Sequence, residues 1–200
     1  MSNARSPYFL RMRCAVTALR LAVRAVALAP VVAPALAAQS AVAAPTGSVE
    51  SALTSVATAS DLDRLVGSGW TGTLTYRDYT TEARTTIKAA LLFTRSSTVG
   101  DEAARWDFRI AYADEPHANS GEIVSLASDG RWFRGARVVE RTVLANGTVR
   151  ITTEQEGRDN DRAAAIRLVY TIGERSASLQ KLVRYEGGVY FERHIYEWTR

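Results

Sequence analysis

The stretch RWDFRIAY (residues 105–112) decides the fold, because an apolar side chain stands at every second position. Side chains of a β-strand point alternately to the two faces of a sheet, so this pattern predicts a strand with one buried face. The same alternation is present in TIKAALLF (residues 86–93) and AIRLVYTI (residues 165–172). No helical periodicity of useful length follows Gly69. The sequence therefore predicts an all-β domain.

Further alternating segments bring the expected number of strands to nine or ten, at the spacing that is typical of barrels and sandwiches. These segments are residues 70–79, 122–127, 138–145, 148–155, 178–185 and 189–198. Asn146-Gly147, Asp129-Gly130 and Gly187-Gly188 favour tight hairpin turns between them. The number depends on residues 131–145, which form one bent strand or two strands separated at Gly135. An up-and-down sheet closes most simply with an even number of strands. We therefore expect a single antiparallel barrel of about ten strands, with a sandwich as the alternative.

One short helical turn is expected before the first strand. In SDLDRLVGSG (residues 60–69), Ser60 or Asp61 can cap the turn, and Gly67 and Gly69 can end it. Residues 45–60 are mostly small and polar, which predicts a flexible linker. Residues 61–200 are then the barrel domain.

Residues 1–44 have the pattern of a secretory signal peptide. Residues 1–49 contain five arginines and no acidic residue, and an apolar run extends over residues 24–44. Ala-x-Ala sequences before Ala38 and Ala44 fit cleavage by a signal peptidase. Pro30 and Pro34 break the run, which is too short for a membrane-spanning helix. We expect a secreted or periplasmic protein without a membrane span, and an organellar transit peptide is the alternative.

The net charge of the chain comes from this leader. The whole chain has 25 basic and 21 acidic side chains, and without the five leader arginines 20 basic side chains face 21 acidic ones, a formal charge of −1. A nucleic-acid-binding domain needs a basic face, so no nucleic acid partner is expected. The single cysteine, Cys14, also lies in the leader, so the domain after it has no thiol for a disulfide.

Four stretches carry a resemblance to a known fold family: WTGTLTYRDY (residues 70–79), DEPH (114–117), DNDRAAAIR (159–167) and FERHIYEW (191–198). Through them, residues 62–200 resemble the lipocalin-like (calycin) β-barrels, and most closely exported bacterial barrel proteins of uncharacterised function. The resemblance implies the barrel fold and the binding of a small ligand.

Two charges on apolar faces are the sequence features that best indicate such a site. Arg193 stands between Phe191 and Ile195, and Asp78 shares a face with Leu74. A buried charge without a partner is costly, so we expect the two charges to pair with each other or with a ligand, or to lie at the barrel mouth. The expected ligand is small and apolar or amphipathic. The expected binding residues are Trp70, Tyr76, Asp78, Trp106, Phe108, Tyr112, Tyr170 and Arg193.

Two other functions stay open. One is an envelope interaction protein with a filled barrel. The other is an enzyme that brings Asp114, Glu115 and His117 together with Asp159 at one rim, which an even number of strands permits. No motif marks a nucleophile, so no catalytic residue is assigned.

Asp159-Asn160-Asp161 is interpreted as a turn, because these side chains bond their own backbone and tolerate left-handed angles. Carboxylates could instead hold calcium, but the spacing of a calcium loop is missing. His194 could bind haem, yet alternation predicts that it points outward if Arg193 points inward. No metal and no cofactor are expected.

Overall fold

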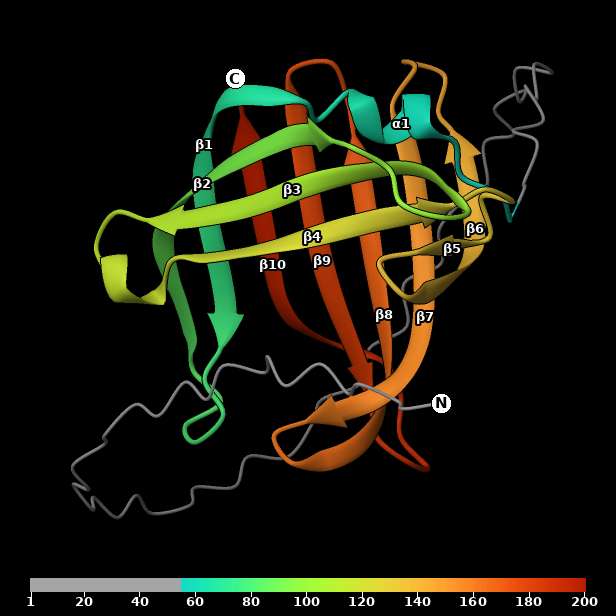
Figure 1. The fold of residues 1–200 in the computed structure, drawn as a ribbon. Helices are drawn as coiled ribbons and strands as arrows, with labels where there is room; N and C mark the ends of the chain where they lie inside the picture. The colour runs from blue at the N-terminus through green and yellow to red at the C-terminus, as the bar shows by residue number, and fades with distance from the viewer. Residues whose placement is uncertain (1–54) are drawn as a thin grey trace, which may run out of the picture. The chain divides into compact units, whose positions relative to one another are not determined.

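Each alternating segment of the sequence forms a strand that pairs with its neighbours along the chain, and the ends of the sheet meet to close a barrel (Figure 1). The computed structural model describes residues 55–200. The strands are β1 (Gly67–Arg77), β2 (Arg84–Ser96), β3 (Glu102–Tyr112), β4 (Ser120–Ala127), β5 (Trp132–Phe133), β6 (Ala136–Val143), β7 (Val149–Asp159), β8 (Arg162–Ile172), β9 (Ser176–Arg184) and β10 (Phe191–Thr199). All neighbouring strands are antiparallel, which confirms the expected ten-strand up-and-down barrel.

The barrel closes between β1 and β10, where Gly72 lies opposite Trp198. A Cβ atom on Gly72 would stand 1.8 Å from the carbonyl oxygen of Glu197. No side chain fits in that space, so a glycine is needed for the two strands to approach this closely.

Residues 131–145 form two strands, as one of the two alternatives predicts. Arg134 and Gly135 connect β5 to β6 and have φ angles of 55° and 75°. Two successive positive φ angles are typical of the type I′ turn, whose twist matches that of a β-hairpin.

The expected helical turn is α1 (Ala59–Asp63), which begins earlier than the sequence suggested. Thr58, and not Ser60 or Asp61, is the capping residue, and the carboxylate of Asp61 accepts hydrogen bonds of 2.8 Å from both the backbone N–H and the hydroxyl of Thr58. Just before it, Ala57 is buried and its N–H bonds the carbonyl of Gly130 at 2.9 Å. Residues from Ala57 onward therefore pack on the barrel, although they fall inside the stretch interpreted as a linker. A second short helical segment, η1 (Pro116–Ala118), connects β3 to β4.

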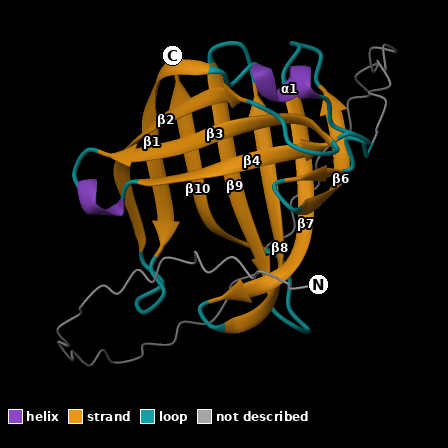
Figure 2. Ribbon diagram, in the orientation of Figure 1, coloured by secondary structure: helices purple, strands orange, loops and turns teal. Residues whose placement is uncertain are grey.

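Helix α1 covers one end of the barrel (Figure 2). Leu62 is fully buried there, and the indole N–H of Trp106 donates to Asp63 at 3.0 Å. Asp61 forms a bidentate ion pair with Arg141 of β6, with N–O distances of 2.7 and 2.8 Å. Apolar burial and a hydrogen-bonded charge pair together fix the helix on the barrel.

Aromatic rings fill the barrel interior next to α1. Phe93 stacks on Trp106 with ring centroids 5.6 Å apart, and Trp106 meets Phe133 edge-on at 6.2 Å. Phe133 in turn contacts Tyr170 at 5.2 Å. Such pairs add to the stabilisation from buried area, so this half of the barrel is a packed aromatic core.

The expected signal peptide, residues 1–44, lies outside the described residues. Among residues 55–200, no helix is both long enough and apolar enough to cross a membrane.

Candidate functional site

A cluster of charged side chains is buried in the barrel near the β7–β8 hairpin, at the end remote from α1 (Figure 1). It consists of Asp159, Lys181 and Arg193, together with Tyr79 and Tyr185, and is called the charged cluster below. The side chain of Asp159 has no exposed surface, and those of Arg193 and Lys181 are 5% and 14% exposed. Buried charges of this kind require partners, because desolvation costs several kcal/mol per ion.

Asp159 is the centre of the cluster. Its Oδ1 accepts hydrogen bonds from Tyr79 (3.0 Å) and Lys181 (2.9 Å). Its Oδ2 accepts from the Tyr185 hydroxyl (2.9 Å) and from Nε of Arg193 (3.0 Å), and Nη2 of Arg193 lies 2.9 Å from the same oxygen. A carboxylate has about four lone-pair positions, so Asp159 has no acceptor capacity left.

The strands explain how these residues meet. Asp159 ends β7 on the same face as Ile151 and Thr153, which are fully buried. Lys181 shares the buried face of β9 with Leu179. On β10 the pairing with β9 shifts between Glu192 and His194, so Arg193 is the extra residue of a β-bulge. A bulge turns a side chain away from strict alternation, and here Arg193 enters the barrel.

The electrostatics of the cluster favour an ionised Asp159 and a protonated Tyr79. Burial alone would raise the pKa of Asp159, but the hydrogen bonds and charges of Lys181, Tyr185 and Arg193 outweigh it and lower the pKa below its usual value. Burial and the neighbouring Asp159 carboxylate raise the pKa of Tyr79 to about 12. Near neutral pH, Asp159 is therefore ionised, and Tyr79 keeps the proton that it donates.

His194 faces the barrel interior, which corrects the prediction that it points outward. Alternation places His194 on the same face as the buried Tyr196 and Trp198, and the bulge at Arg193 allows the neighbouring Arg193 to enter the barrel as well, so an inward Arg193 does not require an outward His194. The imidazole meets the Tyr196 ring edge-on at 5.4 Å. Burial, and then the positive charge of Lys181, lower the pKa of His194 to about 3, so the ring is neutral.

Asp78 does not pair with Arg193, so the first of the three alternatives for these two charges is not the one observed. The Oδ1 atom of Asp78 accepts hydrogen bonds from the backbone N–H groups of Thr80 and Thr81 and from the Thr81 hydroxyl. Asp78 thus fixes the β1–β2 turn, as Asp side chains often do. The next residue, Tyr79, is the one that reaches the charged cluster.

The aromatic residues expected to line a ligand site lie mostly in the core. Tyr76 is partly buried against this core. The other five are buried in it: Trp70, Trp106, Phe108, Tyr112 and Tyr170. The hydroxyl of Tyr112 bonds that of Tyr196 at 2.7 Å. Their rings are therefore engaged largely with other residues of the core.

The Asp159-Asn160-Asp161 segment is a turn in part. Asn160 and Asp161 have φ angles of 49° and 60° and form the two-residue β7–β8 turn, as expected. Asp159, by contrast, points into the barrel. Within residues 55–200, no group of three or more His, Cys, Asp or Glu side chains is arranged to hold a metal ion.

The residues of the enzyme hypothesis differ in their exposure to solvent. Asp114 and His117 are exposed on the loop around η1, and Glu115 is half-buried there. Asp159 is buried, and its donors come from Tyr79, β9, the β9–β10 loop and β10. Asp159 is thus committed to cations and tyrosine hydroxyls and has no acceptor capacity for this loop.

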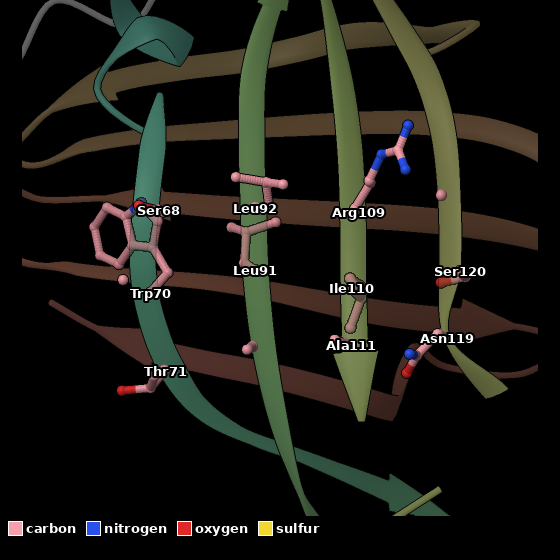
Figure 3. A pocket seen from close by; sticks show the side chains of 13 residues that line it. Ser68, Trp70, Thr71, Leu91, Leu92, Arg109, Ile110, Ala111, Asn119 and Ser120 are labelled. Carbon is pink, nitrogen blue, oxygen red and sulfur yellow. The ribbon is translucent and has the colours of Figure 1, made fainter. Parts of the chain in front are cut away.

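A separate cavity of about 590 Å³ lies on the outer wall of β1 to β4 (Figure 3). Leu92 of β2 and Arg109 of β3 contribute exposed side chains to it, and Trp70 lines it from the core side. The Arg109 guanidinium is paired with Asp107 at 2.7 Å. The charges of this cavity are balanced, whereas the charged cluster has a cation in excess, so the cluster is the stronger candidate for recognition.

Sequence reasoning identified Arg193 but missed Lys181, Tyr79 and Tyr185. Lys181 could have been found, because it stands two residues from both Leu179 and Val183 on an apolar alternating face of β9. Tyr79 and Tyr185 come from loops and reach the cluster only through the tertiary fold.

Comparison of the sequence with protein-family models and with curated proteins finds no match.

Proposed function

We propose that this protein is an exported, lipocalin-like barrel that binds a small, partly apolar ligand at the end of the barrel that holds the charged cluster. The observation that carries the proposal is the division of the barrel interior into a packed aromatic half and a half with buried charges. An interior divided in this way suits an amphipathic molecule, since binding sites are mostly apolar with a few convergent polar groups.

The rings around the charged cluster support an apolar contact at this end. Tyr79 and Phe191 lie on the guanidinium of Arg193, with its central carbon 4.3 and 4.9 Å from the two ring centroids. The ring of Tyr185 packs on that of Phe191, with the two ring centroids 5.7 Å apart. The proposed ligand places its polar group on the cluster and its apolar part against these rings.

Native mass spectrometry tests the proposal on protein exported by its own host. We expect an additional mass that is lost on denaturation and is absent from the same chain refolded from denaturant. The proposal is wrong if the exported protein has the mass of the chain alone and the refolded chain binds neither octanoate nor octanamide.

The stacked rings beside α1 favour a second candidate, an envelope interaction protein whose barrel is filled. Trp70 and Trp106 have no exposed surface, so nothing more can enter that half without displacing the core. In that case, substitutions in the charged cluster change the free energy of unfolding and leave small-molecule binding undetectable in every variant.

A further inference from the structure

The charged cluster contains one more positive charge than negative. Within residues 55–200, Asp159 is the single carboxylate that forms ion pairs with both Lys181 and Arg193. The nearby Arg134 is already paired with Glu122, so it does not change the excess of one positive charge. A buried charge without its counter-charge is among the most costly features of a protein interior, so this cluster favours the arrival of an anion.

Arg193 provides the free donor. Its Nε and Nη2 atoms are bonded to Asp159 and to the Tyr185 hydroxyl, the latter at 3.2 Å. Its Nη1 atom is buried and has no hydrogen-bond partner. Three other buried side-chain atoms in residues 55–200 lack a partner, those of Thr153, Tyr170 and Trp198, and Arg193 is the charged residue among the four. An unsatisfied buried donor on a charged group costs more than one on a neutral group.

The excess of positive charge also acts on His194 and helps to keep its imidazole neutral. After burial, the charge of Lys181 contributes most to lowering its pKa, and Arg134 and Arg193 act in the same direction against the opposing charge of Asp159.

Tyr79 covers Arg193 from the outside. Its side chain belongs to the β1–β2 loop and is 43% exposed, while its ring lies on the guanidinium and its hydroxyl bonds Asp159. A half-exposed loop residue that contacts buried charges can be displaced more readily than the strands around it.

We propose that Arg193 binds the carboxylate of a small apolar monoanion, which displaces the ring of Tyr79 and accepts a hydrogen bond from Nη1. This inference rests on the proposed function and narrows its ligand class. A carboxylate carries one negative charge, which equals the excess of the cluster, whereas a phosphate monoester carries about 1.5 to 2 and would exceed it.

Isothermal titration of the refolded chain with octanoate, octanamide and octyl phosphate tests the inference. The three probes share an alkyl chain and differ in the head group. We expect octanoate to bind at least tenfold more tightly than the neutral amide and more tightly than the phosphate.

Variants locate the site. Arg193→Met should reduce octanoate affinity to that of octanamide, and Tyr79→Ala should increase it severalfold by uncovering the guanidinium. Arg109→Met is the matched control, because Arg109 is 64% exposed on the outer wall, and it should leave all affinities unchanged. If Arg193→Met does not fold, the ratio of octanoate to octanamide affinity in the wild-type chain and the effect of Tyr79→Ala on octanoate affinity still test the inference.

The outcomes separate the two proposals. Equal binding of octanoate and octanamide, or an octanoate affinity that Arg193→Met leaves unchanged, overturns the carboxylate site and leaves small-ligand binding intact. Tighter binding of octyl phosphate overturns the choice of carboxylate. If none of the three probes binds, the carboxylate site is contradicted, and the proposed function is contradicted with it only when the exported protein also has the mass of the chain alone.

Discussion

Arg200 lies on the indole of Trp70, with the guanidinium carbon 4.3 Å from the ring centroid. The same guanidinium donates to the carbonyls of Val66 and Arg64, at 3.2 and 3.1 Å. The indole N–H of Trp70 donates to Leu65 at 2.9 Å. The end of the described chain is thus fastened to the segment between α1 and β1, which covers one end of the barrel.

Replacing Arg200 with Met should lower the free energy of unfolding by about 1 kcal/mol, through loss of the cation–π contact and of hydrogen bonds to the backbone. Urea denaturation measures the change. Arg150→Met, at an exposed position of β7, is the control and should leave the midpoint of urea denaturation unchanged. An equal effect of both substitutions would mean that the contact with Trp70 contributes nothing specific.

Replacing Asp159 with Asn should destabilise the barrel strongly. It leaves Lys181 and Arg193 buried without a counter-charge, a change that typically costs roughly 3–5 kcal/mol. A double-mutant cycle between positions 159 and 193 should give a coupling energy of roughly 0.5–3 kcal/mol. The cycle between Asp78 and Arg193 is the control. Coupling at 78–193 with none at 159–193 would reverse the assignment of the ion pair.

The stability of the protein should fall as the pH is lowered from about 6.5. The folded protein keeps His194 neutral down to a pKa of about 3, whereas the unfolded chain takes up the proton near 6.5. Protonation therefore favours the unfolded state. The contribution of His194 to the free energy of unfolding is complete above pH 6.5 and decreases towards pH 3, by about 1.4 kcal/mol per pH unit.

The pH dependence can be assigned with one substitution and one control. The charged groups that act on His194 are Lys181, Asp159, Arg193 and Arg134, and its ring also packs on Tyr196. His194→Phe keeps the ring contact and should flatten the profile between pH 6.5 and 4.5. His117→Phe, on the exposed loop, should retain the wild-type slope. If the stability profile of His117→Phe is flat instead, His194 is not the source of the pH dependence.

Export should remove the leader. The acid-free residues 1–49 and the two Ala-x-Ala sequences predict that N-terminal sequencing of exported protein begins near Ala38 or Ala44. Retention of Arg11 and Arg20 in the mature protein would contradict a signal peptide.

The strand pattern was predictable because alternation is a local property. Trp106, Phe108 and Ile110 are buried on one face of β3, as the spacing alone requires. The direction of Arg193 was also correct, but its partner was not identified, since the partner depends on which residues meet across the barrel. A bulge in β10 reverses the alternation after Arg193, and no residue type near it marks a bulge. For Asp159 a signal existed, because it has the same parity along the strand as Ile151 and Thr153.

The close approach at Gly72 has a consequence for how the barrel forms. The contact joins the first strand to the tenth, so it can be made only after the eight strands between them have been synthesised. Every other pairing links strands that follow one another along the chain. The nine local pairings can therefore form stepwise, while the closing one involves a large sequence separation and is expected to come late. Until it forms, β1 and β10 each have an unpaired edge, the arrangement through which strands of separate molecules aggregate.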